Sequence, residues 1–206
     1  MKSVLISIQP KWCELIANGN KTVEVRKTKP KLETPFKVYI YCTKGNSLNY
    51  LKRPFFDNYQ KFWVDNNAFG SNVARANGKV IGEFVCNNID WHGLSNLIVK
   101  EDTEHTLNGT CLTKEEILNY LGYKKGTNIY ACKNYDFYGW HISNLVIYDK
   151  PRELSEFMKE CKLECDMRSL KVPPCEKCEH LIASFGCGRT ITRPPQSWCY
   201  VESEVK

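Results

Sequence analysis

The sequence has no long hydrophobic run, and this absence excludes one large class of proteins. No stretch reaches the roughly eighteen consecutive apolar residues that a membrane-spanning helix needs. At the N-terminus, Met1-Lys2-Ser3 leads into an apolar strand of only five residues, which is shorter than the hydrophobic region of a secretory signal. We therefore expect neither a membrane span nor a secretory signal. With 206 residues, the chain is long enough to bury a sizeable core.

A strong excess of one charge sign is also missing. The formal net charge of +6 suits a polyanionic partner without requiring one. Much of the excess is local, because five basic residues fall within eleven positions: Lys21, Arg26, Lys27, Lys29 and Lys31. Such a run is either a solvated loop or an edge that contacts phosphates, and its continuity with the strand described next favours the phosphate-contacting edge.

That strand follows a helix stop near the N-terminus. Gly19 can adopt the left-handed conformation that ends a helix, and Val23 and Val25 alternate with polar residues, which is typical of a strand. Because side chains two apart share a face, Thr22, Glu24 and Arg26 line one side, and Lys21 lies at the turn into the strand. Periodicity alone favours an exposed surface with ion pairs.

The stretch from Ile6 to Arg26 resembles a known family signature. Ser7-Ile8-Gln9-Pro10-Lys11 leads to Gly19-Asn20-Lys21-Thr22-Val23-Glu24-Val25-Arg26. This is similar to the N-terminal pattern of the ASCH domain family, a short strand, one helix and then Gly-x-Lys-Thr-x-Glu-x-Arg. The resemblance implies a fold similar to the PUA domain of RNA-modifying enzymes.

Two later stretches resemble phage and prophage ASCH proteins. Residues 138–143, Tyr-Gly-Trp-His-Ile-Ser, are similar to a late strand region of those proteins, and Asp149-Lys150-Pro151 is similar to the turn that follows it. Residues 193–201 resemble their closing strand. The resemblance therefore brackets the chain from both ends.

Hydrophobic periodicity and turn residues predict the other elements. We expect strands at residues 4–8, 36–42, 79–86, 128–132 and 138–148, and a loop with a strand at 87–99. A helix should begin at Pro10, and a second should begin with the capping box from Thr113 to Glu116 and end at Gly122. Glu83 is a carboxylate in an otherwise apolar run: in the interior it would be costly unless it met Lys21 or Arg26, and on an exposed face it would carry no meaning.

A cysteine cluster precedes the closing strand. Eleven cysteines, an odd number, without a secretory signal favour the reducing cytoplasm over a disulfide framework. The spacing Cys161-x3-Cys165 and Cys175-x2-Cys178, with Cys187 nearby, is typical of thiolates that share one tetrahedral ion. We expect a structural zinc held by Cys165, Cys175, Cys178 and Cys187, with Cys161 or His180 as alternative ligands. Unliganded thiols packed on the barrel are the other interpretation.

The predicted fold is α+β. We expect a PUA-like mixed β-barrel with peripheral helices over residues 1–150, interrupted at about 45–78 by an insertion rich in aromatic residues. These aromatic residues either pin the insertion to the barrel or stack nucleic-acid bases. A small cysteine-rich, zinc-stapled segment at 151–192 precedes the closing strand and tail at 193–206.

The first functional hypothesis is a binding module. The resemblance implies recognition of RNA or a modified nucleotide in a cleft, where Lys21 and Arg26 hold phosphate or a base edge and Glu24 orients them or accepts from a base amine. The other predicted ligand-binding residues are Tyr41, Thr43, Trp140, Gln196, Ser197 and Trp198.

The alternative hypothesis is a nucleic-acid-directed hydrolase in which Lys21 and Glu24 are catalytic. ASCH relatives include acetylcytidine amidohydrolases, which use a Lys and a Thr three residues later, and a ribonuclease. Lys21 matches the Lys, but Glu24 stands where the Thr is expected, and a carboxylate does not replace a hydroxyl nucleophile directly. To act as a catalytic base, Lys21 would also need a lowered pKa, which Arg26 would favour and Glu24 would oppose.

Overall fold

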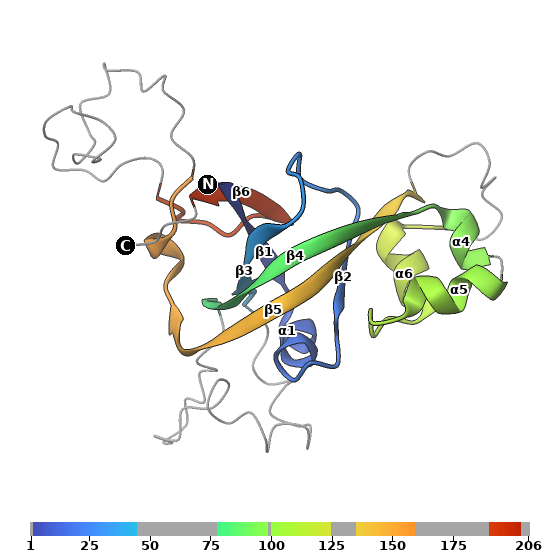
Figure 1. The fold of residues 1–206 in the computed structure, drawn as a ribbon, viewed down its shortest axis with the longest axis horizontal. Coiled ribbons are helices and arrows are strands. Elements are labelled where there is room, and N and C mark those ends of the chain that lie inside the picture. Colours follow the sequence, from blue (N-terminus) through green and yellow to red (C-terminus); the bar gives the residue numbers. More distant parts are fainter. Residues whose placement is uncertain (1, 45–77, 99, 125–134, 160–189, 203–206) are drawn as a thin grey trace, which may run out of the picture. The chain divides into compact units, whose positions relative to one another are not determined.

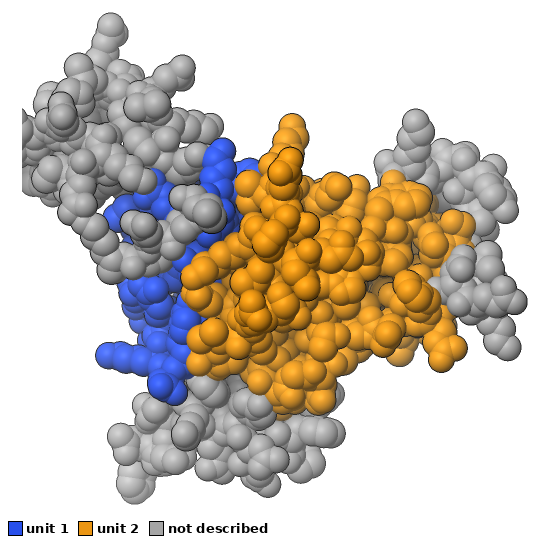
Figure 2. All heavy atoms as spheres, in the orientation of Figure 1, with its two compact units in different colours: residues 1–8, 39–82, 148–206 blue, residues 9–38, 83–147 orange. Residues whose placement is uncertain are grey.

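The computed structural model describes residues 2–44, 78–98, 100–124, 135–159 and 190–202. The chain divides into two compact units, each discontinuous in sequence (Figure 2). Unit 1 contains residues 1–8, 39–82 and 148–206, and unit 2 contains residues 9–38 and 83–147. Most of the predicted aromatic insertion, residues 45–77, and most of the cysteine-rich segment, residues 160–189, lie outside the described residues.

Within these described ranges, six strands form one sheet in the order β2-β5-β4-β3-β1-β6 (Figure 1). Their bounds are β1 (Lys2–Ile8), β2 (Val23–Arg26), β3 (Phe36–Cys42), β4 (Val80–His92), β5 (Phe137–Arg152) and β6 (Trp198–Glu202). With helices in the same chain, the predicted α+β class is confirmed.

The described strands form an open sheet instead of the predicted barrel. Closing a barrel requires hydrogen bonds between the first and last strands of the order. Here β2 and β6 stand at opposite ends of the order, and their ladders run to β5 and β1 respectively. Strands of four and five residues offer few backbone groups for closure. The prediction of a barrel is therefore wrong for this part of the chain.

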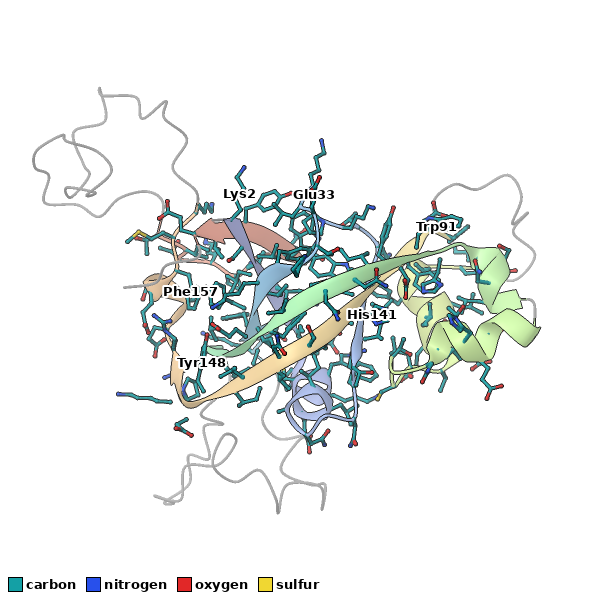
Figure 3. All side chains as sticks on the ribbon, in the orientation of Figure 1. Lys2, Glu33, Trp91, His141, Tyr148 and Phe157 are labelled. Carbon is teal, nitrogen blue, oxygen red and sulfur yellow. The ribbon has the colours of Figure 1, made fainter. Side chains whose placement is uncertain are left out.

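Unit 1 is built around the pairing of β1 with β6. The two strands are antiparallel, and Leu5 lies opposite Cys199. The short 3-10 helix η3 (Leu154–Glu156) follows β5. Next to it lies Phe157 (Figure 3). Its ring packs edge-on against that of Tyr39, with 5.0 Å between the ring centroids. The buried core of this unit comes from strands and from the residues after η3: Leu5, Tyr39, Tyr41, Val80, Phe157, Ile191 and Val201.

Unit 2 contains the helices α1 (Pro10–Ala17), α4 (Leu94–Ile98), α5 (Lys100–Leu107) and α6 (Lys114–Leu121). Buried apolar residues of α4 and α6 meet strand residues in a second core: Val25, Leu94, Leu97, Ile117, Leu121 and Phe137. Within this unit, β2 runs antiparallel to β5, with Glu24 opposite Trp140. None of the helices in the described part of the chain is both long and apolar enough to span a membrane.

The predicted beginnings and ends of helices α1 and α6 in unit 2 are confirmed. Pro10 occupies the first turn of α1, and Gly19 has a φ of 78° just after its end. The capping box of α6 is complete, because the Thr113 hydroxyl accepts from the Glu116 amide and the Glu116 carboxylate accepts from the Thr113 amide. Gly122 ends α6 in the left-handed conformation, with a φ of 79°.

Two local predictions are wrong. The loop and strand expected at 87–99 are instead the continuation of β4 to His92, followed by α4. The turn expected at residues 149–151 lies inside β5, which continues to Arg152. Pro151 is tolerated there because it stands one residue from the end of the strand, where a missing amide donor is least costly.

We predict that Gly109→Ala destabilises the protein far more than Gly19→Ala. Both glycines have positive φ values, 72° and 78°, so each alanine carries a backbone cost of about 1–2 kcal/mol. A Cβ at Gly109 would also press on the Thr22 hydroxyl and lie 3.2 Å from Val23 Cγ2, whereas one at Gly19 meets nothing within 4 Å. Overpacking adds about 1–3 kcal/mol. Thermal denaturation of both variants checks this, and equal melting temperatures would contradict it.

Candidate functional site

Backbone hydrogen bonds place Lys21 between α1 and β2. After the turn at Gly19, the Lys21 amide donates to the Leu15 carbonyl at 2.9 Å. The amides of Thr22 and Val23 both donate to the Gly109 carbonyl, each at 2.9 Å. The loop between α5 and α6 is thereby fastened to the start of β2.

Three charged side chains converge at β2. Lys21 Nζ lies 3.5 Å from Glu24 Oε2, and Arg26 Nη2 lies 3.0 Å from Glu24 Oε1. All three residues are buried, with exposed fractions of 2%, 6% and 7% for Lys21, Glu24 and Arg26. This burial excludes the exposed surface with ion pairs that the periodicity of the strand alone favoured. We call these residues the charged triad.

The charged triad carries more positive than negative charge. Lys21 and Arg26 can each be +1, while Glu24 is −1, so the fully ionised group has a formal charge of +1. A buried net charge is costly unless further interactions compensate for it. An anionic ligand or a neutral Lys21 would each lower this positive charge.

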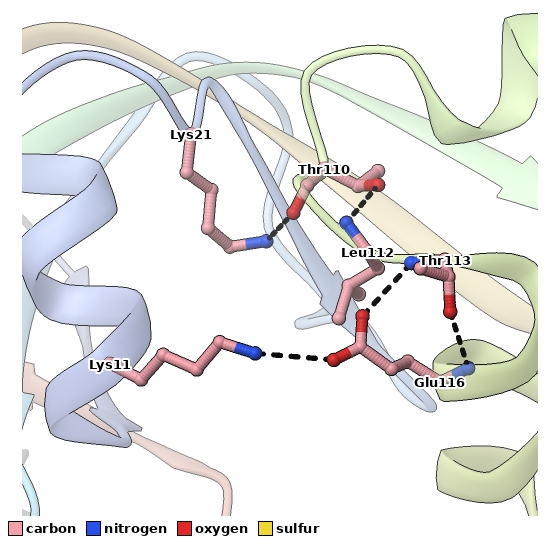
Figure 4. A network of polar contacts seen from close by, with 6 residues as sticks. All are labelled: Lys11, Lys21, Thr110, Leu112, Thr113 and Glu116. Carbon is pink, nitrogen blue, oxygen red and sulfur yellow. Dashed lines mark hydrogen bonds and ion pairs between the residues drawn. The ribbon is translucent and has the colours of Figure 1, made fainter.

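Burial lowers the pKa of Lys21 below its ordinary value, because desolvation disfavours the charged ammonium. The charge of Glu24 opposes this shift and that of Arg26 adds to it, as expected from the sequence, but burial is the largest cause. Lys21 Nζ also donates to the Thr110 carbonyl at 2.5 Å (Figure 4). An amine can make this hydrogen bond in either protonation state.

Helices α1 and α6 contribute charged and aromatic groups beside Lys21. Lys11 Nζ pairs with Glu116 Oε1 at 3.2 Å (Figure 4). The Trp12 ring centroid lies 4.1 Å from Lys11 Nζ and 5.3 Å from Lys21 Nζ, so both cations face one indole. Trp12 is half-buried. Helix α6 supplies Glu116.

Two exposed lysines after β2 lie over tyrosine rings. Lys27 Nζ is 5.1 Å from the Tyr120 ring centroid, and Lys29 Nζ is 5.7 Å from that of Tyr138. Tyr120 is 41% exposed, and Tyr138 lies opposite Arg26 on β5. We call these four residues the basic–aromatic surface. Lysines interleaved with aromatic rings provide groups for both phosphates and base faces.

Sequence reasoning missed Thr110, Glu116 and Tyr120 as neighbours of the charged triad. Thr110 is 89 residues from Lys21 and contributes a backbone carbonyl, which leaves no side-chain signal. The 3.6-residue period of α6 separates its buried residues from the others. It does not indicate which segment those other residues face.

Of the other predicted ligand-binding residues, one is completely buried and five belong to unit 1. Trp140 is completely buried on β5, and its ring packs edge-on against Phe36 with 5.9 Å between centroids. Tyr41, Thr43, Gln196, Ser197 and Trp198 belong to unit 1. Of these, Tyr41 lies in the core and Gln196 is exposed. Their roles toward a ligand stay predictions.

Glu83 lies in unit 2, where it pairs with Lys37 at 2.6 Å. This ion pair gives the carboxylate a partner without Lys21 or Arg26. The predicted zinc ligands, Cys165, Cys175, Cys178 and Cys187, lie outside the described residues. Within the described ranges, no three His, Cys, Asp or Glu residues are grouped so that they could hold a metal ion.

The sequence matches the ASCH domain over residues 6–137, and the chain therefore belongs to the ASCH domain family. This range contains the charged triad and the Tyr120 side chain. The likeness to phage and prophage members stays a prediction. A search of curated proteins finds no match to the chain.

Solved structures of an ASCH protein from Zymomonas mobilis are similar to this chain. One is 17% identical, covers 98% of this chain and 88% of its own, and has a TM-score of 0.42. Structures of two single-residue mutants of that protein are 18% and 17% identical, with TM-scores of 0.41. The first covers 75% of this chain and 77% of its own, and the second 98% and 89%.

Proposed function

We propose that the chain binds RNA or a modified nucleotide through unit 2, at the charged triad and the basic–aromatic surface. The observation that carries this proposal is that one buried carboxylate, Glu24, is shared by two buried cations. The excess positive charge is suited to a phosphate. Membership of the ASCH family, which is associated with RNA binding, supports the same ligand class.

The basic–aromatic surface supplies the exposed contacts. Lys27 and Lys29 can meet phosphates, while the Tyr120 ring can stack with an unpaired base. Single-stranded RNA offers both groups along its length. Ligand contacts by Tyr41, Thr43, Gln196, Ser197 and Trp198, which belong to unit 1, are a separate proposal.

We predict that the double variant Lys27→Ala/Lys29→Ala weakens RNA binding and flattens its salt dependence. Each phosphate contact adds about 0.7 to the slope of log K against log salt for a single strand, so losing two lowers the slope by about 1.4. Fluorescence anisotropy with a short single-stranded RNA measures the slope. Lys79→Ala is the matched control, since Lys79 pairs with Glu153 in unit 1. An unchanged slope in the double variant would contradict the proposed surface.

A second candidate function is a nucleic-acid-directed hydrolase that uses Lys21, with Glu24 as its second catalytic group. The lowered pKa of Lys21 favours it, because it makes the neutral amine, the form that can act as a base, easier to reach. Incubation with short RNAs and with acetylated cytidine tests it. Turnover by the wild type that Lys21→Ala abolishes would support an enzyme, whereas binding without turnover would support the binding module.

The zinc site is a separate proposal. We expect about one zinc per chain, held by four thiolates from Cys165, Cys175, Cys178 and Cys187 in a reducing compartment such as the cytoplasm. Elemental analysis of protein purified without chelator measures it. A content below about half an equivalent in a folded preparation would contradict the site.

A further inference from the structure

Trp91 presents a large apolar ring to solvent near the end of β4 (Figure 3). With 59% of its surface exposed, it is the most exposed large apolar residue in the described part of the chain. A Cβ at Gly93 would lie 3.3 Å from Trp91 Cη2, so the outer edge of the indole lies over the backbone two residues further on. The ring is therefore in contact with the chain on one edge and open to solvent over the rest of its surface.

Contacts between β4 and β5 determine the face of the sheet on which Trp91 lies. Asp90 Oδ2 is 2.5 Å from His141 Nε2. The His92 ring stacks on the Phe137 ring, with 5.1 Å between the ring centroids. Asp90 and His92 thus share one face, and because successive side chains of a strand point to opposite faces, Trp91 between them points to the other.

Tyr138 lies on the same face as Trp91. On β5, the residues in those contacts are Phe137 and His141, so Tyr138 points away from them by the same alternation. Because β4 and β5 are neighbours in the sheet, Tyr138 is a direct or diagonal cross-strand neighbour of Trp91, with about 5–8 Å between their Cβ atoms. Lys29 Nζ lies 5.7 Å from the Tyr138 ring centroid. Trp91 therefore continues the basic–aromatic surface from β5 onto β4.

The neighbours of Trp91 favour a nucleic acid as the group that covers its ring. An unpaired nucleotide needs an aromatic face for its base and a cation for its phosphate. Trp91 supplies an exposed face, and the exposed Lys29 beside Tyr138 supplies a cation. A continuous apolar patch, which would favour a protein partner, would not place a charged ammonium at this point.

We propose that Trp91 stacks with an unpaired base of a single-stranded RNA whose phosphates contact Lys27 and Lys29. The proposal rests on the proposed function, because it assumes that RNA occupies the basic–aromatic surface. It extends that surface to a third strand and restricts the ligand to RNA with an unpaired base at this position, since a duplex hides the faces of its bases. The contact adds affinity without adding a charge.

Fluorescence anisotropy tests the contact with two probes, a short single-stranded RNA and the same RNA annealed to its complement. Trp91→Ala should weaken binding of the single strand by about 5- to 150-fold, as is usual when one stacking contact is lost. The slope of log K against log salt should stay unchanged, because no phosphate contact is lost. Binding of the duplex should change little. Trp91→Phe keeps an aromatic ring and should recover most of the affinity.

A second experiment locates the stacked base. The single-stranded RNA is prepared with one base removed at a time, and each form is titrated into the wild type and into Trp91→Ala. At the stacked position, removing the base should weaken binding to the wild type but not to the variant, because the two changes remove the same contact. Val146→Ala is the matched control, since Val146 is 51% exposed on β5 in the same unit, and it should bind like the wild type.

The outcomes separate this inference from the proposed function. If Trp91→Ala bound the single strand as tightly as the wild type, the inference would be overturned and RNA binding would stand. Equal losses of affinity for the single strand and the duplex would also overturn it, because they would indicate a general change of the protein. Self-association of the wild type that Trp91→Ala abolishes, with RNA affinity unchanged, would assign the ring to a protein contact instead. RNA that fails to bind the wild type would overturn both proposals.

Discussion

Replacing Glu24 with glutamine is expected to destabilise the protein by about 3–5 kcal/mol, because it leaves two buried cations without their shared carboxylate. Lys21 can limit the loss by releasing its proton, but Arg26 cannot. For a chain of this size, the change corresponds to a decrease in melting temperature of roughly 6–20 °C. Thermal and urea denaturation measure it.

The matched control for this prediction is Glu153→Gln. Glu153 pairs with Lys79 at 2.7 Å, but its side chain is 59% exposed. An exposed ion pair stabilises a protein by about 0–1 kcal/mol, so the free energy of unfolding of the control should be close to that of the wild type. If the free energy of unfolding of Glu24→Gln also lay within about 1 kcal/mol of that of the wild type, the charged triad would not be an energetically coupled unit.

The second large effect is expected on ligand binding. Lys21→Met keeps most of the side-chain volume and removes the amine, and it should weaken RNA binding by at least about 30-fold, since losing one partner of a buried charge pair costs about 2 kcal/mol or more. Fluorescence anisotropy at fixed salt and pH measures the affinity. Circular dichroism verifies that the variant is folded.

Lys37→Met is the matched control for Lys21→Met. Lys37 lies in the same unit and also pairs with a carboxylate, Glu83, but its side chain is 40% exposed. We expect its RNA affinity to stay within about twofold of the wild type, as is usual for a charge away from the interface. If the two variants bound RNA equally well, Lys21 would have no role in the ligand site.

The parts of the fold that could be predicted are those with a local physical cause. Helix α1 begins at Pro10, which lacks an amide hydrogen. It ends before Gly19, which tolerates a positive φ. The Thr113 capping box determines where α6 begins, and clean alternation determines β3. Each of these signals acts within a few residues.

The missed elements lack such signals. Helix α5 has the sequence Lys-Glu-Asp-Thr-Glu-His-Thr-Leu, and among its residues whose burial is described the buried one is the polar Thr106, so no apolar stripe marks it. The later half of β4 contains Asn88 and Asp90, and Trp91 is 59% exposed there, which breaks the expected alternation. Pairing with neighbouring strands, which sequence patterns do not show, holds this segment extended.

The sequence predicted the charged residues of the candidate site but not the segments that bury them. The spacing of Lys21, Glu24 and Arg26 on a turn and strand indicated that the three groups could meet, and they do. Their burial depends on α1, on the loop at Thr110 and on α6, which are brought together by the tertiary fold. The same distant segments supply the largest cause of the lowered Lys21 pKa, which is desolvation.

The most direct test of the ligand site is a titration of ¹⁵N-labelled protein with a short single-stranded RNA, followed by two-dimensional NMR. We predict that the largest amide shift changes fall in unit 2, at Lys21 to Lys29 and at Thr110 to Tyr120. A second lysine and tyrosine pair, Lys2 over Tyr200 at 5.8 Å on β1 and β6 of unit 1, provides an internal comparison. Shift changes confined to β1 and β6, with none around Lys21, would contradict the proposed site.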